Sequence, residues 1–205
     1  MKTKKKTQVK FTPIPKDIGD YFAYSKESKT GLINKVDRHY RAKKDQEAGW
    51  IDSEGYFRIK VSPKTYAVHR VVYFLCTGID PEEKQIDHID GNPSNNKFSN
   101  LRLATHNQNV YNSKKRKDNT SGVTGVCRDK RSERYEVNIK YKGRLVKLGR
   151  FCDKNEAVAV RIAAEYRFKG EYRNDHNDQY KLSPEMLEWG EKYLEDRIER
   201  LNWDI

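Results

Sequence analysis

Apolar positions follow first a strand pattern and then a helix pattern between residues 56 and 78. Residues 56–61 are typical of a strand, and residues 65–68 of a returning strand after a turn. Residues 68–75 then place valines and a leucine at the i, i+3, i+4, i+7 spacing of one helix face. Gly78 is a suitable end for that helix. The pattern predicts a hairpin followed directly by an amphipathic helix.

A second group of short elements is predicted between residues 84 and 113, where Asp, His and Asn are unusually dense. Residues 86–89 suit a short strand, and the Asp-Gly-Asn-Pro run that follows opens a loop. Residues 101–104 suit a second strand, and Thr105 can cap a helix that runs to about residue 113. The predicted order is strand, loop, strand, helix.

The pattern changes again after residue 121. Residues 123–128 favour a strand, residues 134–141 alternate apolar and polar side chains, and residues 144–151 favour a third strand. An Ala-rich helix follows, with a capping box beginning at Asp153 and with Gly170 as its end. This predicts a three-stranded antiparallel sheet with one face covered by a helix and the other open to solvent.

The two ends of the chain differ in charge and pattern. The first 19 residues are predicted to be a basic flexible tail, and residues 20–54 show no clear pattern. Residues 182–205 predict an amphipathic helix in which Leu187, Leu194, Ile198 and Leu201 would dock on the rest of the protein. The predicted segments are a tail (1–19), a first domain (20–113, core 84–113), a basic linker (114–120), a second domain (121–176) and the C-terminal helix (182–205).

Composition narrows the function classes. The 205 residues carry a formal net charge of +12, with 35% apolar residues, so two small modules are favoured over one large core. Residues 112–150 hold 13 Lys/Arg and 4 Asp/Glu, whereas residues 182–205 hold 3 and 7. This concentrated positive charge predicts a polyanion partner, with nucleic acid favoured over an acidic membrane.

The sequence gives no support to a membrane, secreted or disulfide-rich protein. No apolar run is long enough for a membrane span, and the basic N-terminus lacks the apolar stretch of a secretory signal. Three widely spaced cysteines predict neither a disulfide framework nor a cysteine zinc site. The expected compartment is therefore reducing, which predicts a cytoplasmic location.

Candidate chemistry gathers at Asp87-His88. A carboxylate oxygen from Asp87 and an amide oxygen from Asn109 suit a hard divalent cation such as Mg²⁺, which takes few protein ligands. His88, with a reference pKa of ~6.5, suits the removal of a proton from water. A general base and one metal ion are the groups that can catalyse phosphodiester hydrolysis. An Asp-His pair alone is more often an ordinary surface feature, so the residues around the pair determine whether a catalytic site is predicted.

Those residues resemble the HNH endonucleases, most closely the group of phage and intron-encoded homing enzymes. The resemblance covers residues 55–113 and rests on five short runs. They are Gly55-Tyr56, Val68-His69-Arg70, Asp87-His88-Ile89-Asp90-Gly91-Asn92, Ser99-Asn100-Leu101-Arg102 and Gln108-Asn109.

The resemblance implies a fold and residue roles. The fold is a ββα-metal finger, in which His88 is the general base and Asp87 and Asn109 hold the metal. Asn100 would orient the loop and the base. His106 is a rival ligand to Asn109, because many relatives have His in the helical position. His69 could make a structural hydrogen bond at a helix start or contact DNA, and the role of Arg102 stays open.

The segment after Thr120 resembles the apetala/ethylene-response-factor DNA-binding domain, which phage HNH enzymes often carry behind the nuclease. The matching runs are Ser121-Gly122-Val123-Thr124-Gly125-Val126, Arg134-Tyr135, Leu148-Gly149-Arg150-Phe151 and Glu156-Ala157. The resemblance implies that the open sheet face binds the major groove. The predicted DNA-binding residues are Arg128, Lys130, Arg131, Arg134, Asn138, Lys140 and Lys147 on and near this face, with Lys114, Lys115, Arg116 and Lys117 in the linker.

The family's base-reading pattern is met only in part. The corresponding positions here are Thr124, Cys127, Asp129 and Leu145, which are weaker base readers. Affinity would then come mainly from phosphate contacts, with strong salt dependence and little sequence choice.

Together these features predict an α+β protein with a ββα-metal HNH finger followed by a three-stranded antiparallel sheet on one helix. The expected function is metal-dependent hydrolysis of duplex DNA, as a nicking homing-type enzyme. The alternatives are a DNA-binding regulator with an inactive HNH domain, or a structure-selective phage recombination or packaging nuclease. The expected cofactor is Mg²⁺ or another divalent ion such as Mn²⁺, without zinc, small-molecule cofactor or membrane partner. A monomer or weak dimer is expected.

Overall fold

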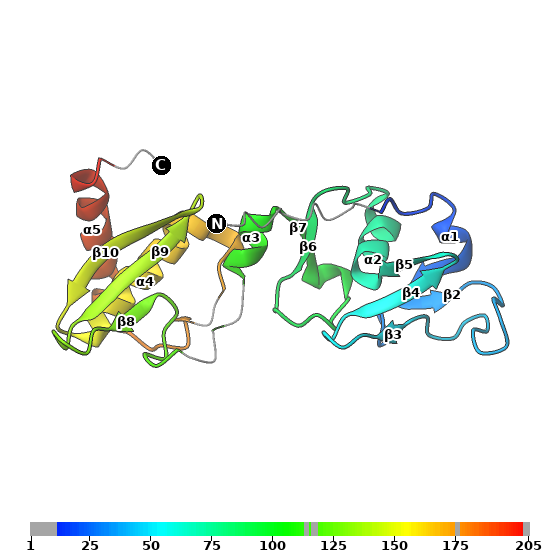
Figure 1. Cartoon of the computed structure of the whole chain (residues 1–205), viewed down its shortest axis with the longest axis horizontal. Helices are drawn as coiled ribbons and strands as arrows, with labels where there is room; N and C mark the ends of the chain where they lie inside the picture. Colours follow the sequence, from blue (N-terminus) through cyan, green and yellow to red (C-terminus); the bar gives the residue numbers. More distant parts are fainter. Residues whose placement is uncertain (1–11, 113–114, 116–118, 175–176, 203–205) are drawn as a thin grey trace, which may run out of the picture. The chain divides into compact units, whose positions relative to one another are not determined.

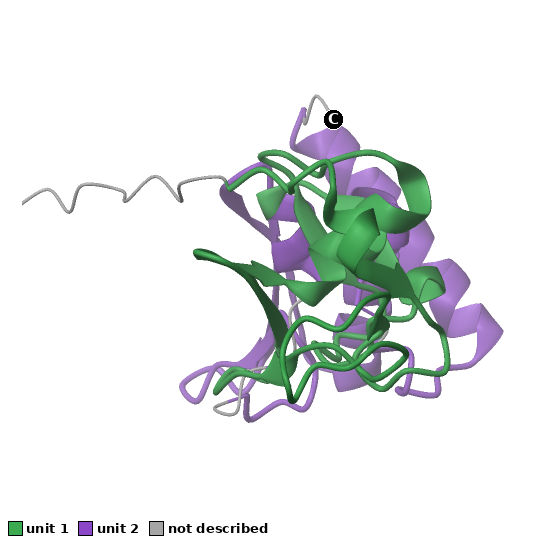
Figure 2. Ribbon diagram, turned by 90° about the vertical axis from the view of Figure 1, so that its right-hand side faces the viewer, with its two compact units in different colours: residues 1–106 green, residues 107–205 purple. Residues whose placement is uncertain are grey.

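The computed structural model describes residues 12–112, 115, 119–174 and 177–202. The chain divides into two compact units, residues 1–106 (unit 1) and 107–205 (unit 2), which Figure 2 shows in green and purple. Each unit combines small antiparallel sheets with helices, as expected of an α+β protein (Figure 1). None of the helices among the described residues is long and apolar enough to cross a membrane.

Unit 1 is built from short strands around one central helix. Its hydrogen-bonded sheets have the orders β1-β2, β3-β4-β5 and β6-β7, and every pair is antiparallel. The elements are α1 (Ile18–Tyr21), β1 (Phe22–Tyr24), β2 (Leu32–Asn34), β3 (Trp50–Ile51), β4 (Phe57–Val61), β5 (Lys64–Ala67), α2 (Val68–Thr77), β6 (Gln85–His88), the 3₁₀ turn η1 (Phe98–Asn100), β7 (Leu101–Ala104) and the start of α3 (His106–Tyr111).

The predicted helix after residue 68 is confirmed as α2. Val68, Val71 and Val72 are buried, as the helical spacing requires. The helix ends at Gly78, which adopts a left-handed φ of 72° and donates its N–H to the Phe74 carbonyl. The predicted strands at residues 56–61, 86–89 and 101–104 are found as β4, β6 and β7.

The N-terminal part of unit 1 contributes more to the core than its sequence pattern indicates. Ile14 and Ile18 are buried, and the Ile14 amide donates to the Asp80 carboxylate at 2.8 Å. The predicted basic tail therefore ends before Ile14, while residues 1–11 lie outside the described residues. Phe22 and Leu32, from strands that the sequence did not predict, are also fully buried in this core.

Unit 2 contains the predicted three strands and helix. The sheet order is β10-β9-β8, all antiparallel, with a register shift between Lys147 and Gly149. The elements are the rest of α3, β8 (Val126–Arg128), β9 (Tyr135–Tyr141), β10 (Arg144–Phe151), α4 (Lys154–Lys169), the 3₁₀ turn η2 (Gly170–Tyr172) and α5 (Pro184–Arg200).

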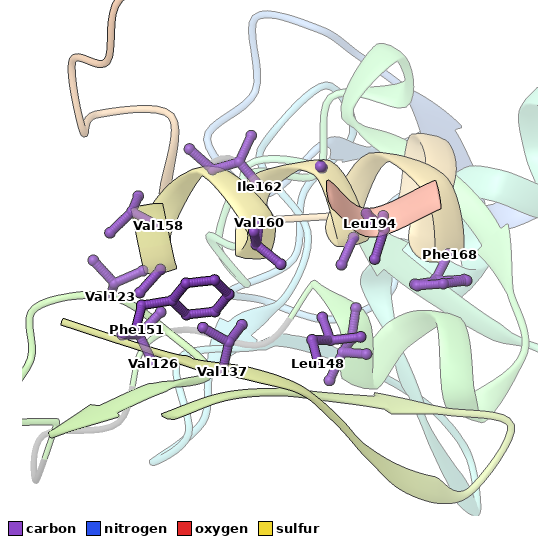
Figure 3. Packing of buried hydrophobic residues seen from close by; sticks show 14 residues of the cluster. Val123, Val126, Val137, Leu148, Phe151, Val158, Val160, Ile162, Phe168 and Leu194 are labelled. Atoms are coloured by element: carbon purple, nitrogen blue, oxygen red, sulfur yellow. The ribbon is translucent and has the colours of Figure 1, made fainter. Parts of the chain in front are cut away.

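The apolar side of this sheet packs against α4, as Figure 3 shows. Val137 and Ile139 in β9 are buried, which confirms the predicted alternation. The Asp153 side chain accepts from the amides of Asn155 and Glu156, so the predicted cap of α4 is also confirmed. Burial on one face leaves the side chains of Asn138 and Lys140 on the other.

The C-terminal helix α5 packs along α4. Leu194 is buried, and Leu187 and Ile198 lie partly buried against the same core. Gly190 permits the close approach, because a Cβ there would lie 2.7 Å from the Ala159 carbonyl carbon. Leu201 lies beyond the end of α5 and is 40% exposed, so its predicted docking was wrong.

A buried polar network ties α4 to the rest of unit 2. Glu165 accepts from Arg161 (2.6 Å to Nη2) and Lys169 (3.1 Å), and its other oxygen accepts from Asn177 at 3.0 Å. Arg161 also donates to the Asn138 carbonyl in β9. Burial lowers the pKa of Lys169, and Glu165 opposes that shift. Each buried charge in this network thus has an opposite charge beside it.

Candidate active site

The hairpin β6–β7 positions the two residues predicted to carry the chemistry. Asp87 and His88 are adjacent in β6 and only 3% and 6% exposed. In the antiparallel register Asp87 lies opposite Arg102 and His88 lies opposite Leu101. Because neighbours in a strand point to opposite faces, the two side chains contact different surroundings.

Asp87 forms an ion pair with Arg102 across the hairpin. The Arg102 Nη2 and Nε atoms lie 2.7 and 2.9 Å from the same carboxylate oxygen, Oδ2. This gives Arg102, whose role the sequence left open, a defined contact in the site. An ionised carboxylate has about four lone-pair positions, so an arginine on Oδ2 is compatible with a cation on the same group.

His88 is held among two other rings and one amide. Its ring lies 5.1 Å from the His69 ring and 6.0 Å from the Tyr56 ring, centre to centre. Its Nε2 atom is 3.1 Å from the Asn96 Oδ1 atom. Burial lowers the pKa of His88, while the Asn96 hydrogen bond and the nearby Asp90 and Asp87 oppose this shift. A lowered pKa favours the neutral imidazole, which is the form that accepts a proton.

His69 lies in the first turn of α2 and packs against the same rings. The Tyr56 ring is 5.6 Å away, and the His69 Nδ1 atom is buried without a hydrogen-bond partner among the described residues. Burial, followed by the repulsion of His88, lowers the pKa of His69 to about 3. His69 is therefore neutral at pH 7 and acts here as a packing partner of His88.

The Asn100 side chain holds the loop between β6 and β7 through three hydrogen bonds. Its amide nitrogen donates to Asp90 Oδ1 and to the Asn95 carbonyl, both at 2.9 Å, and its side-chain oxygen accepts from the Asp90 amide at 3.0 Å. Burial raises the pKa of Asp90, but hydrogen bonds from Asn95, the Asn92 amide and Asn100 together lower it. Asn100 thus orients the loop.

The side chain that contacts His88 from this loop is Asn96, which the sequence reasoning did not select. Asn96 is only 3% exposed, and its Nδ2 atom donates to the Thr30 carbonyl at 2.8 Å. Two further hydrogen bonds hold this loop. The Phe98 amide donates to Tyr24 Oη in β1 at 3.1 Å, and the Ser94 hydroxyl donates at 2.9 Å to the carbonyl of Gly55, which precedes β4. The available sequence signal was the Ser-Asn-Asn run at residues 94–96 within an otherwise polar loop.

The predicted second metal ligand lies in α3. The boundary between the two units falls after His106, so Asn109 belongs to unit 2. His106, the rival ligand, is exposed and has its Nδ1 atom 3.4 Å from the Gln85 amide nitrogen. The described residues contain no cluster of three or more His, Cys, Asp or Glu side chains suited to a metal ion. The roles of Asn109 and His106 therefore stay predictions.

The predicted DNA-binding residues of unit 2 are mostly exposed. Arg128, Lys130, Arg131, Arg134, Lys140 and Lys147 are all exposed, whereas Asn138 is partly buried. The Asn138 side-chain oxygen is buried without a hydrogen-bond partner among the described residues. Lys147 pairs with Glu136 at 2.9 Å and Arg128 with Glu133 at 3.5 Å, which reduces the net positive charge of this face.

The predicted linker can be followed only in part. Lys115 is exposed and donates to the Gly122 carbonyl at 3.1 Å. Lys114, Arg116 and Lys117 lie outside the described residues. Their predicted phosphate contacts stay predictions.

Comparison with known proteins bears on the segment that contains this site. A family model described as HNH endonuclease matches residues 66–111. Protein 3.8 of Escherichia phage T7 is 40% identical over 76 residues, which are 37% of this chain and 63% of that protein. DNA endonuclease I-HmuI of Bacillus phage SP01 is 36% identical over 102 residues, which are 47% of this chain and 55% of that protein.

A third relative is uncharacterized HNH endonuclease L560 of Acanthamoeba polyphaga mimivirus. It is 39% identical over 83 residues, which are 40% of this chain and 38% of that protein. The chain thus spans less than two thirds of the length of each of these relatives. No solved structure matches the chain. The family match includes Asp87, His88, Asn96 and Asn100, so residues 66–111 are similar to an HNH endonuclease domain, a class of nuclease hydrolase.

Proposed function

We propose that this chain is a metal-dependent endonuclease that hydrolyses phosphodiester bonds in duplex DNA. The observation that carries the proposal is the Asp87-His88 pair, buried at the end of β6 within the segment that matches the HNH family. One relative over this region is named a DNA endonuclease, which supports DNA as the substrate.

His88 is the proposed general base. Its neighbours hold the ring in place, and its lowered pKa keeps it unprotonated near pH 7. The neutral ring takes a proton from a water molecule as the water oxygen attacks phosphorus. Asn100 supports this step from a distance, because it holds the loop that follows His88.

Asp87 and Asn109 are the proposed holders of a divalent cation. Both offer oxygen atoms, which are the ligands that a hard cation such as Mg²⁺ or Mn²⁺ prefers, and Asp87 is nearly fully buried. Such an ion supplies positive charge that stabilises the charge developing on the phosphate. The assignment of Asn109 rests on the sequence resemblance.

The exposed basic residues of the β8–β9–β10 face are proposed to hold the duplex. Lys140 and the arginines around residues 128–134 suit phosphate oxygens, which give affinity with little sequence choice. One hydrolytic site cuts one strand, so nicking is the proposed outcome. The homing role is a further part of the proposal, and it requires cleavage at one long site.

The test is cleavage of supercoiled plasmid with Mg²⁺, with and without EDTA. The wild type should convert the plasmid to the nicked circle, and EDTA should stop the reaction. His88→Ala should lower the rate by about 10²- to 10⁴-fold, the usual contribution of a general base. His39→Ala is the matched control, because His39 is an exposed histidine of the same unit outside the site. A wild type that shifts duplex DNA in a gel but never nicks it would contradict the enzyme.

A further inference from the structure

A second cavity, of about 430 Å³, lies in unit 1 between residues 34–50 and the strand β4. This volume is within the range of small-ligand sites, about 300–1,000 Å³. The lining combines a buried amide (Asn34), an indole ring (Trp50) and three cationic side chains (Arg38, Arg41 and Lys60). We propose that this cavity binds one unpaired nucleotide, with the base on Trp50 and Asn34 and the phosphate on the cationic side chains.

Asn34 is a buried amide with one end that has no partner. It is the last residue of β2 and is only 1% exposed. Its Nδ2 atom donates to the Gln46 carbonyl at 3.2 Å, and because a carbonyl only accepts, the amide nitrogen must face Gln46. The Oδ1 atom at the other end is buried without a hydrogen-bond partner in the described part of the chain. Since buried polar atoms are nearly always paired, this acceptor points to a donor supplied by a ligand.

The chain segment that carries Arg38 and Arg41 is held in place by local hydrogen bonds. The Arg38 amide donates to the Ala42 carbonyl at 2.9 Å and closes a tight turn. Asp37 accepts from the Lys43 ammonium at 3.1 Å and from the Lys44 amide at 2.8 Å. This wall of the cavity is therefore formed by the protein itself, as is usual for ligand sites.

The Trp50 ring is accessible for stacking. It lies in β3 and is 47% exposed. Gly49 before it has a φ of 108°, and a Cβ there would lie 2.6 Å from the Arg58 carbonyl oxygen, so glycine lets β3 approach β4. The next residue, Ile51, points to the opposite face of the strand. Every base has a π face that can stack on such a ring.

The cationic side chains suit a phosphate. The ion pairs of unit 1 among its described residues include none of Arg38, Arg41 and Lys60. The guanidinium groups of Arg38 and Arg41 lie over aromatic rings, 4.6 and 4.9 Å from the ring centres. Burial lowers the pKa of Arg38, and an anion beside it would offset that effect. Glu47 also lines the cavity, but it already accepts from the Lys29 amide.

An unpaired nucleotide fits these groups better than a base pair does. In a duplex the faces of each base are covered by its neighbours, and the N–H groups of the Watson–Crick edge are used by the partner base. An unpaired nucleotide exposes both, and pockets that take one read it by stacking and by hydrogen bonds to that edge. The inference rests on the proposed function for DNA as the source of the nucleotide, and it deepens that function, because it adds a preference for DNA with an unpaired base.

The first experiment measures binding by the full chain in EDTA, so that no cleavage takes place. Two labelled duplexes are compared by fluorescence anisotropy, one fully paired and one with a single extra, unpaired adenine. The wild type should bind the second about 5- to 150-fold more tightly, the usual worth of one base stacked on an aromatic side chain. Trp50→Ala should remove this preference and keep the affinity for the paired duplex, whereas Ile51→Ala, the matched control in β3, should keep the preference. A preference that survives Trp50→Ala would overturn the inference.

A change in the ligand tests the Asn34 acceptor. Replacing the unpaired adenine by purine, which lacks the amino group, should weaken wild-type binding by about 2- to 10-fold, the usual worth of one hydrogen bond. Asn34→Ala should bind both duplexes equally. If Asn34→Ala does not fold, the wild-type comparison decides alone, because it changes only the DNA. Equal wild-type binding of adenine and purine would overturn the inference.

Free nucleotides test the phosphate and the source of the nucleotide. Binding of dAMP and of deoxyadenosine is followed by tryptophan fluorescence. Arg41→Ala should weaken dAMP binding by about 10-fold and leave deoxyadenosine binding unchanged, with Lys64→Ala, at an exposed position of β5, as the control. Binding of dAMP without a preference for the unpaired adenine in DNA would support the site and assign it to free nucleotides. A wild type that shows neither would overturn the inference.

Two outcomes separate this inference from the proposed function. A wild type that nicks plasmid but recognises neither the unpaired adenine nor dAMP contradicts only the inference. A wild type that binds the unpaired adenine through Trp50 and never nicks contradicts the nuclease and supports the nucleotide site.

Discussion

Both units bury polar side chains, but these side chains contact different partners. In unit 1 they include Asp87, His88 and Asn96, which lie at the end of one hairpin and in its irregular loop. In unit 2 they include Arg161 and Glu165, which lie within a regular helix beneath a sheet. Buried polar side chains therefore lie at a hairpin and its loop in unit 1 and within a helix in unit 2.

The Glu165 network of unit 2 and the histidine cluster of unit 1 also differ in how completely they are paired, although elsewhere in unit 2 the Asn138 Oδ1 atom has no hydrogen-bond partner in the described part of the chain. Glu165 accepts four hydrogen bonds from three side chains, so its charge is fully matched. In unit 1 the buried His69 Nδ1 atom has no hydrogen-bond partner among the described residues. A fully satisfied network rigidifies a frame, whereas an incompletely paired group usually needs a separate explanation. We therefore expect the stability of unit 2 to depend on its buried charges and the stability of unit 1 to depend on pH.

The largest expected effect is in unit 2. Glu165→Gln keeps the shape of the side chain but removes the charge that faces Arg161 and Lys169, which are themselves buried. The free energy of unfolding should fall by about 3–5 kcal/mol, the usual cost of leaving a buried charge unpaired. Urea denaturation followed by circular dichroism measures it. Glu188→Gln, at an exposed position of α5, is the control, and equal stability of the two variants would remove the contrast.

The next effect concerns acid and unit 1. The folded-state pKa of His69 is about 3, below the ordinary value of 6.5, so the unfolded chain binds the proton more tightly. Stability is then fully present above about pH 6.5 and is lost as the pH falls toward about 3. Between about pH 7 and about pH 4, unit 1 should lose about 3 kcal/mol more in the wild type than in His69→Phe.

Hydrogen exchange can assign that loss to a unit. Exchange should accelerate at low pH in peptides from α2, after correction for the intrinsic pH dependence, and much less in peptides from α4. The variant should show a smaller acceleration in α2. Equal acceleration of α2 exchange in the wild type and in His69→Phe would mean that His69 is not the group that makes the stability of unit 1 depend on pH.

The smallest effect concerns the basic face of unit 2. Lys140 has no ion pair among the described residues, whereas Lys147 is partly neutralised by Glu136. Lys140→Ala should therefore weaken duplex binding more than Lys147→Ala and should reduce the slope of log K against log salt by about 0.9 for the lost phosphate contact. Gel shifts at several salt concentrations measure both, with Lys192→Ala in α5 as the control. A larger effect at Lys147 would reverse the expected order.

Sequence alone predicted the elements with a strong period and missed those without one. The spacing of Val68, Val71 and Val72 predicted α2, and the alternation in β9 predicted which side chains are buried. Residues 22–51 form strands of only two or three residues, too short for a period to show. Ile14 was assigned to a tail because the charges around it hide one isolated apolar side chain.

The site was predictable where its residues are close in sequence. Asp87, His88 and Asn100 were selected from one short stretch, and the structure brings the first two into one buried strand with Asn100 holding the adjoining loop. The contact from Thr30 to Asn96 joins residues 66 positions apart, and no local pattern encodes it. The pairing of Asp87 with Arg102 likewise depends on the register of the hairpin.

The bonds from the N-terminal strands to the loop also bear on how this protein folds. Thr30 to Asn96 and Tyr24 to Phe98 are contacts of high sequence separation, and we expect them to form late because a long stretch of chain must close first. The loop between β6 and β7 should then reach its final conformation only after β1 and β2 have docked. A fragment cut to the family-matching residues 66–111 would keep Asp87 and His88 but lack that support, so a minimal nuclease designed from this chain should begin no later than Ile14.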